Sequence, residues 1–376
     1  MKPVDMKKTI FSQVKYSLKS LHPQEPTGHS LKRLNSLSGL VTGMIRRKSS
    51  HLPDIGSGLP QDINAASRVI HAKRFLSNKW TDYETHYFPF LSAFLENLLG
   101  KAPINKGVRL VIDGSQMGSK HVALVVSLVW KKRSIPICWF VRKGKKGHFP
   151  EQMHIDIIKE AANILHSILS PKTKVTLLGD GEFDGVGLQK LCRQVLGWNY
   201  ISRTASNRIL YENEDLFKPK YTHIAKGETY LLIPSVDFSK SKFPDVNFLH
   251  WHHPDYIDPI FLISNLDDPL VIMDYYRLRF SIETMFKDLK SRGFNLHKTR
   301  LKDSSCIFNL LIVGALCFCF ITGLGYVYQN SPMKKKVQEK KNQQLSIFSL
   351  GLAFFHYFIE REIPFVFSLI VSKNSS

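Results

Sequence analysis

A mixed α/β fold is predicted for the centre of this 376-residue chain. Three observations predict it. From residue 107 onward, short apolar and β-branched runs replace the helical periodicity of the first hundred residues. Their order is three strands, a helix, and then strand, helix and strand, which is typical of a mixed sheet flanked by helices. A very apolar stretch at 306–328 follows, which is long enough for a helix buried on all sides.

Residues 1–100 are expected to form a basic helical domain. Ser30 can cap a helix that carries a leucine stripe. Prolines and glycines between 53 and 60 then break the chain, and two further helical stretches follow at 63–76 and 83–99. Because this part of the chain is basic, we interpret it as a DNA-binding bundle. A helical bundle with a solvated basic rim is the alternative.

Residues 101–330 are expected to hold the sheet, with residues 204–258 as a β-rich insertion. The insertion is polar, aromatic and irregular, and its weaker strand signals lie near 229–234 and 247–252. The strands expected in the sheet itself are 108–113, 121–130, 134–141, 174–179, 199–203 and 260–264. The helices expected between them are 150–169 and 185–196.

The last part of the chain, residues 331–376, is expected to be a helical tail. It carries a basic run at 334–341, which we interpret as an exposed loop, followed by an apolar helix. The preceding apolar stretch at 306–328 could pass for a membrane span by length. Its asparagine, threonine and glycines favour a buried core helix instead, so no membrane association is expected.

The charge of the chain points to a polyanionic partner. Lys and Arg outnumber Asp and Glu by 52 to 31, which gives a formal net charge of +21. Nucleic acid is the commonest partner of so basic a protein, and an anionic membrane surface is the less common one. The five cysteines include no C-x-x-C pair, and no signal peptide is expected, so we predict a reducing cytoplasmic environment.

Three carboxylates are the candidate catalytic residues. Asp113 and Asp180 each follow an apolar β-branched run and precede a glycine, as expected for side chains at the carboxyl edge of a sheet. Glu283 lies on a helix predicted at 276–290. If the two strands are neighbours, the three side chains converge. Such a set suits two Mg²⁺ or Mn²⁺ ions, which prefer oxygen ligands and catalyse in-line phosphoryl displacement.

The helix at 276–290 presents a patterned face. Tyr276, Arg279, Glu283 and Lys290 are spaced three, four and seven residues apart, and all three spacings return to one helix face. A neighbouring apolar stripe would dock this helix on the core. A surface helix with a simple Glu–Arg pair is the alternative when the helix is considered alone.

Together the segments VIDGSQMG, LLGDGEFDG and YYRLRFSIETMFKDLK resemble the three catalytic blocks of the DDE transposases of insertion-sequence group four. The helix motif of that family is Y-x2-R-x3-E-x6-K, and Tyr276, Arg279, Glu283 and Lys290 meet each spacing. The resemblance covers roughly residues 30–360. It implies an RNase H-like catalytic domain with a β-rich insertion and an N-terminal helical DNA-binding domain.

The resemblance also implies roles for these residues. Asp113, Asp180 and Glu283 would bind the metal ions. Tyr276, Arg279 and Lys290 would hold the transposon end by its phosphates, as their side-chain chemistry also suggests. The expected function is cut-and-paste transposition of double-stranded DNA by a homodimer in a synaptic complex, within the bacterial cytoplasm and close to the nucleoid.

Alternatives to this function and to individual residues remain open from the sequence. An RNase H-like structure-specific nuclease would cut DNA without joining it, and a domesticated DNA-binding protein would do neither. Asp184 is a second carboxylate in the LLGDGEFDG block, although we expect it to begin or cap a helix. Trp251 is expected in the core rather than at a flipped base, and the irregular spacing of the histidines beside it disfavours a zinc site.

A basic segment, RKGKKGH, lies between the third strand and the helix that follows it. We expect its Arg142, Lys145 and Lys146 to contact phosphates near the active edge of the sheet, and a solvated hairpin is the alternative.

Overall fold

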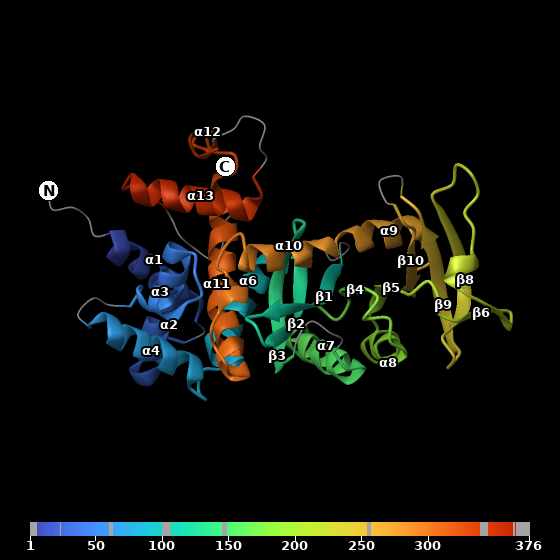
Figure 1. Cartoon of the computed structure of the whole chain (residues 1–376), viewed down its shortest axis with the longest axis horizontal. Helices are drawn as coiled ribbons and strands as arrows, with labels where there is room; N and C mark the ends of the chain where they lie inside the picture. Colours follow the sequence, from blue (N-terminus) through green and yellow to red (C-terminus); the bar gives the residue numbers. More distant parts are fainter. Residues whose placement is uncertain are drawn as a thin grey trace.

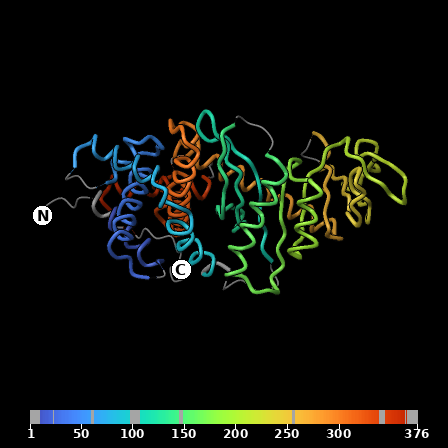
Figure 2. Tube along the Cα trace, turned by 90° about the horizontal axis from the view of Figure 1, so that it is seen from below, coloured from blue at the N-terminus to red at the C-terminus, as the bar shows by residue number. Residues whose placement is uncertain are grey.

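The computed structural model describes residues 6–22, 24–59, 63–99, 107–144, 149–253, 257–338, 345–363 and 365. The molecule is elongated in both views, with the N-terminal helices at one end, a mixed sheet in the middle and an antiparallel extension of that sheet at the other end (Figures 1 and 2). The expected α/β class with flanking helices is therefore confirmed.

The N-terminal part is helical, as predicted, with two differences. The first concerns the cap, because the second helix begins at Gly28 with Thr27 as its N-cap, and Ser30 lies inside its first turn. The second concerns the helix expected at 83–99, which is interrupted at Tyr87. Pro89 follows this break and has no N–H to donate to the preceding turn. The helices are α1 (Met6–Leu21), α2 (Gly28–Arg47), α3 (Leu52–Gly56), α4 (Ala65–Ser77), α5 (Tyr83–His86) and α6 (Phe88–Leu99).

All strands of the described residues belong to one mixed sheet, in the order β3-β2-β1-β4-β5-β10-β9-β8-β6-β7. The first three strands form an antiparallel meander, β4 and β5 then add in parallel to β1, and β10 is antiparallel to β5. The sheet is therefore mixed, as the order of the predicted elements indicated. The strands are β1 (Val108–Met117), β2 (His121–Trp130), β3 (Arg133–Lys143), β4 (Val175–Gly179), β5 (Asn199–Arg203) and β10 (Ile260–Ser264).

The insertion at 204–258 is more regular than expected, because its strands extend the same sheet beyond β10. Strand β9 pairs with β10 along its length, so the apolar side chains of the insertion gain a small core of their own around Phe248. The two strand signals expected near 229–234 and 247–252 correspond to the longest of the new strands. The strands are β6 (Leu210–Glu212), β7 (Asp215–Phe217), β8 (Tyr230–Phe238) and β9 (Phe243–Trp251).

Helices cover both faces of the central sheet. Cys138 and Trp139 are neighbours on β3, so their side chains point to opposite faces. The Cys138 thiol donates to the carbonyl of Ile157 on α7 (Glu151–His166), and the Trp139 indole N–H donates to the carbonyl of Phe308 on α11 (Ser304–Tyr328). Helix α7 therefore covers one face and α11 the other. Helix α8 (Val186–Lys190) continues into a π-helical turn at Leu191–Leu196.

Helix α11 is the central helix of the fold. It has the length and apolarity to cross a membrane, but 94% of its most apolar window is buried inside the protein, as expected of a core helix. Asn309 donates to the carbonyl of Leu76 on α4, and Cys317 donates to that of Val41 on α2. One apolar core consequently runs from the N-terminal helices through the sheet to the tail.

The tail contains α12 (Lys334–Val337) and α13 (Ile347–Glu360). Helix α12 is a correction, because its lysines were expected in a loop. Helix α13 packs against α11, and Gly351 lies so close to the Ile321 carbonyl that a Cβ there would meet it at 2.0 Å. This close approach is the reason for glycine in an otherwise bulky helix.

Candidate active site

Two aspartates from neighbouring strands form the centre of the site. Strands β1 and β4 pair in parallel from Val108 opposite Val175 to Val111 opposite Leu178. If this register is continued by two residues, Asp113 lies level with Asp180. The predicted convergence of the two aspartates therefore follows from the strand pairing. Strand β1 does not end at Asp113 as expected, because its antiparallel pairing with β2 continues to Met117.

The backbone holds both carboxylates in place. Asp113 Oδ1 accepts from the N–H of Gly114 at 2.7 Å, and Asp180 Oδ1 accepts from the N–H of Glu182 at 2.9 Å. On the far side of β1 from Asp113, a Cβ on Gly114 would lie 2.7 Å from the ring of Phe149. Glycine after the aspartate thus lets α7 and its preceding turn pack directly behind the site.

The helix expected at 276–290 consists of two helices, α9 (Pro269–Arg277) and α10 (Phe280–Leu289). Their junction is tightened into 3₁₀ geometry. The N–H groups of Arg279 and Ile282 bond to carbonyls three residues earlier, at 3.0 and 3.2 Å. Lys290 is the C-cap residue and not a helical one. Tyr276 therefore lies on α9, Arg279 at the junction, Glu283 on α10 and Lys290 at its C-terminal end.

Helix α10 is fixed to the sheet beside the aspartates. The hydroxyls of Ser281 on α10 and Ser134 on β3 are 2.7 Å apart and buried. Two residues later, Glu283 accepts from Arg279 Nη2 at 2.7 Å, and the side chain of Glu283 is 38% exposed against 9% for Arg279. The carboxylate therefore faces the open side of the site, while the guanidinium lies beneath it.

The carboxylates and Arg279 act on one another electrostatically. The pKa of Asp113 is raised to about 7, mainly by burial and next by the charge of Asp180, with a smaller effect of Glu283 in the same direction and an opposing effect of Arg279. Burial also raises the pKa of Tyr276, and Arg279 opposes this effect. Clustered carboxylates that repel one another are stabilised by a bound cation.

The donor set fits a divalent metal ion, but Glu283 is not turned towards it. Among the described residues, no group of three or more His, Cys, Asp or Glu side chains is arranged to hold a metal ion. Glu283 is paired with Arg279 instead. The two aspartates supply the oxygen ligands that Mg²⁺ or Mn²⁺ prefers. The raised pKa of Asp113 reflects negative charge that its neighbours do not neutralise, which a bound cation would neutralise.

The cationic motif residues lie around the carboxylates. Lys290 donates to Ser115 Oγ at 2.6 Å, and Ser115 shares a strand face with Asp113 because it lies two residues further along β1. Arg279 is buried, and its Nε has no hydrogen-bond partner in the described structure. Tyr276 is only 2% exposed, so only a small part of it can reach a ligand.

Arg142, in the basic segment at the end of β3, is not brought to the carboxylates. Arg142 pairs with Val122 across β2 and β3, which puts its side chain on the α7 face of the sheet, and it stacks on Phe149 at 4.9 Å. Asp113 points to the opposite face. The phosphate contact predicted for Arg142 therefore gains no support from its position. Lys145 and Lys146 lie outside the described residues.

The other acidic candidate has a structural role. Asp184 accepts from Thr204 Oγ1 at 2.7 Å and from Arg208 Nε at 3.0 Å, and it is 3% exposed. Its hydrogen bonds thus connect the turn after β4 to the start of the insertion. Nearby on the sheet extension, His250 bonds to Thr222 at 2.8 Å, and Trp251 is buried in the core as expected.

Sequence reasoning missed two serines that shape the site. Ser115 accepts a hydrogen bond from the Lys290 ammonium, and Ser281 bonds to Ser134 and so fixes α10 to β3. The alternation of strand side chains could have found Ser115, because it lies two residues after Asp113. Nothing in the sequence could have found the Ser281 contact, since its partner is 147 residues away in the chain.

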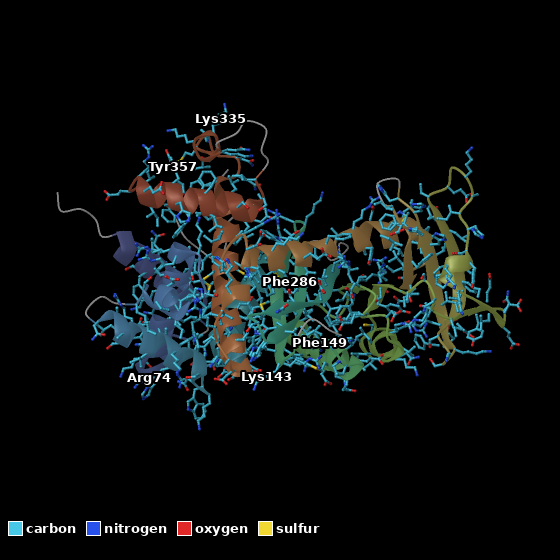
Figure 3. All side chains as sticks on the ribbon, in the orientation of Figure 1. Arg74, Lys143, Phe149, Phe286, Lys335 and Tyr357 are labelled. Atoms are coloured by element: carbon cyan, nitrogen blue, oxygen red, sulfur yellow. The ribbon has the colours of Figure 1, made fainter. Side chains whose placement is uncertain are left out.

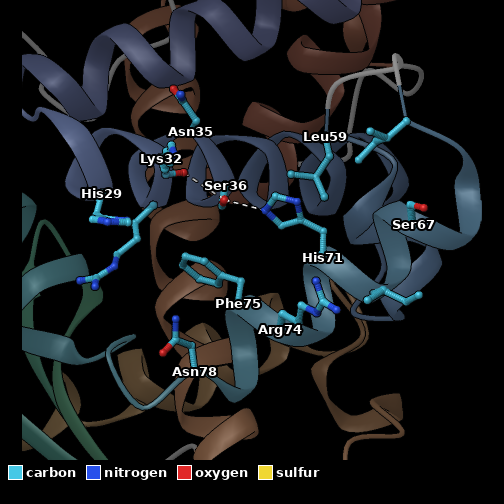
Figure 4. A pocket seen from close by; sticks show the side chains of 13 residues that line it. His29, Lys32, Asn35, Ser36, Leu59, Ser67, His71, Arg74, Phe75 and Asn78 are labelled. Atoms are coloured by element: carbon cyan, nitrogen blue, oxygen red, sulfur yellow. Dashed lines mark hydrogen bonds between the residues drawn. The ribbon is translucent and has the colours of Figure 1, made fainter.

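A second basic site lies in the N-terminal helices. A cavity of about 800 Å³ separates α2 from α4, and within it Ser36 and His71 bond at 2.8 Å (Figure 4). No acidic side chain lines it in the described part of the chain. Arg74 extends from this end of the molecule in the full side-chain view (Figure 3). The basic residues lining the cavity are His29, Lys32, Arg33, His71 and Arg74.

Comparisons with known proteins find a matching family model and solved structures that resemble part of this chain. The comparison with curated proteins finds no matching sequence. Among solved structures, an Argonaute of A. aeolicus is 12% identical, with a TM-score of 0.26, over 55% of this chain and 29% of that one. A Ciona intestinalis endonuclease V, in complex with a DNA that contains inosine, is 14% identical, with a TM-score of 0.28, over 56% of this chain and 91% of that one. Residues 150–320, which include Asp180 and Glu283, match the family model described as "Transposase DDE domain", and this match supports a DDE transposase.

Proposed function

We propose that this protein is a DNA transposase that cleaves the ends of an insertion sequence and joins them to target DNA. The observation that carries the proposal is the register of β1 and β4, which brings Asp113 level with Asp180 beside Glu283 on α10. The family match over residues 150–320 supports the same conclusion. The resemblance of the three sequence blocks to the transposases of insertion-sequence group four is a second, separate support.

In this proposal the three carboxylates, Asp113, Asp180 and Glu283, hold two Mg²⁺ or Mn²⁺ ions. Such ions activate an attacking oxygen and neutralise a leaving oxygen in phosphodiester chemistry. Glu283 must first leave Arg279, to which it is hydrogen-bonded at 2.7 Å. The freed guanidinium, already buried beside the carboxylates, then holds a phosphate oxygen of the bound strand.

The remaining motif residues position the DNA. Lys290 reaches the aspartate face of β1 through Ser115, so its ammonium can contact the phosphate next to the cleaved one. The Tyr276 hydroxyl orders Arg279 beneath that strand. The cleavage step frees a 3′-OH at the end of the element, and the same centre then uses this hydroxyl to attack the other strand or the target.

The N-terminal helices bind double-stranded DNA in this proposal, and two copies of the protein pair the two ends of the element. The basic cavity between α2 and α4 supports a DNA contact at this end of the molecule. A cytoplasmic location at the nucleoid follows from these activities.

Cleavage of a labelled duplex tests the proposal. The duplex carries the inverted repeat found in the DNA that flanks the coding sequence, and wild type is compared with Glu283→Ala and with the exposed control Glu228→Ala. We expect Mg²⁺-dependent cleavage at the repeat boundary by wild type and the control, no cleavage by Glu283→Ala, and equal DNA binding by all three. Cleavage by Glu283→Ala at the wild-type rate would overturn the assignment.

A second assay separates a transposase from a nuclease. A duplex that already ends in the free 3′-OH is mixed with supercoiled plasmid and Mg²⁺. Joined products made by wild type support the transposase. Cleavage in the first assay without joining in the second indicates an RNase H-like nuclease instead.

A further inference from the structure

A row of surface cavities, called the groove below, leads away from Lys290 along the segment that follows α10. It consists of three adjoining cavities of about 310, 910 and 360 Å³. The first two share His297, and the last two share Thr299, Arg300 and Leu301. The turn between β1 and β2 and the end of β3 form the opposite wall of the largest cavity. The shared residues show that each cavity adjoins the next.

The groove is strongly basic. No aspartate or glutamate lines it in the described part of the chain. Burial lowers the pKa of His297, and the charges of Lys298 and Lys290 lower it further, as expected where positive charge is concentrated. The charged side chains that line the groove are Lys120, Lys143, Lys290, Lys298, Arg300 and Lys302.

The two ends of the groove lie at two different parts of the molecule. At one end Lys290 bonds to Ser115 on the strand face that carries the first aspartate. At the other end α3 forms the wall. There the segment is tied to the N-terminal helices by two hydrogen bonds, from Ser50 Oγ to the Asn295 carbonyl at 2.9 Å and from Asn295 Nδ2 to the Lys48 carbonyl at 3.0 Å.

We propose that this groove binds the phosphate backbone of one DNA duplex between the catalytic carboxylates and the N-terminal helices. The inference rests on the proposed function and adds residues 297–302, Lys120 and Lys143 to the DNA-binding surface. Five of the six charged side chains described in the groove are lysines, which act as point charges towards phosphates and do not offer the planar fork that reads base edges. The groove therefore sets the path of the duplex and contributes affinity that is independent of base sequence.

The salt dependence of DNA binding tests the groove. Lys298, Arg300 and Lys302 are exposed, so replacing all three with alanine removes charge without opening the core. Fluorescence anisotropy of a random-sequence duplex is measured in EDTA over a range of salt concentrations. Each phosphate contact contributes about 0.9 to the slope of log affinity against log salt, so the triple variant should lose about 2.7 from the wild-type slope.

A matched control separates local contacts from net charge. Lys334, Lys335 and Lys336 on α12 are replaced with alanine, which removes the same charge from a helix with no buried residue. Lys335 lies on the opposite side of the molecule from Lys143 in the side-chain view (Figure 3). The control should keep the wild-type slope. Equal slopes for the groove variant and wild type would overturn the inference and leave the groove to an acidic protein partner.

This test is independent of catalysis. Binding in EDTA needs no cleavage, so a reduced slope supports the groove even if the cleavage assay fails. If the groove variant keeps the wild-type slope while cleavage depends on Glu283, the groove inference is refuted and the proposed function stands.

Discussion

Replacing Asp113 with asparagine should stabilise the metal-free protein, and the gain should depend on pH. The pKa of Asp113 is raised from 3.8 to about 7 by burial and by Asp180. A carboxyl whose pKa is higher in the folded state contributes stability that is complete below about pH 4 and is lost as the pH rises to about 7. Asparagine keeps the acceptor for the Gly114 N–H but carries no charge to desolvate.

The magnitude follows from the two pKa values. Their difference corresponds to about 4 kcal/mol, and the partial exposure of the carboxylate reduces this, so we expect Asp113→Asn to gain about 2 to 4 kcal/mol near pH 8. Near pH 4 the gain should fall below about 1 kcal/mol. Urea unfolding in EDTA at both pH values measures it. The buried Asp288, whose pKa is also raised, to about 6, affects both proteins equally and cancels in the comparison.

A metal titration completes this prediction. Mn²⁺ should raise the unfolding free energy of wild type and have a smaller effect on Asp113→Asn, because the variant has lost a ligand. A variant that is no more stable than wild type near pH 8, or a gain that is the same at both pH values, would refute the argument from the clustered carboxylates.

Three further predictions concern single side chains. Asp184→Ala should cost about 1 to 3 kcal/mol of unfolding free energy in urea, because it leaves an arginine and a threonine without their buried acceptor. Lys290→Ala should lower the salt slope of DNA binding by about 0.9, and the exposed Lys287→Ala should not change it. Gly179→Ala would place a methyl group 2.6 Å from the Cβ of Phe183 in the next turn and should cost about 1 to 3 kcal/mol of unfolding free energy. Gly181→Ala, whose Cβ would have its nearest neighbour at 3.9 Å, should be nearly neutral. Thermal melts measure both variants.

The central strands and helices could be predicted from sequence because their apolar runs are bounded by turn residues. The strands His121–Trp130, Asn199–Arg203 and Ile260–Ser264 have the expected bounds. Strand β1 was predicted too short, because GSQMG reads as a turn. Only the partner strand β2, which is not a local property, keeps that segment extended to Met117.

The candidate catalytic residues could be predicted in part. Strand context indicated Asp113 and Asp180, and the spacing of the helix motif indicated Glu283. The state of Glu283 could not be predicted, because the choice between a metal ligand and a partner of Arg279 depends on a rotamer and on the 3₁₀ junction beneath it. The face of the sheet to which Arg142 points could not be predicted, because side chains alternate between faces along a strand and a shift of one residue reverses the face.

The place of α11 also has a consequence for how the protein is made. Its side chains fill the space between α2 and α4 on one side and β3 on the other, so neither half can close its apolar surface without it. During translation the first three hundred residues leave the ribosome before this helix does. Both halves therefore expose apolar surface until α11 has been synthesised. Final folding is a late event in which α11 joins the N-terminal helices to the sheet.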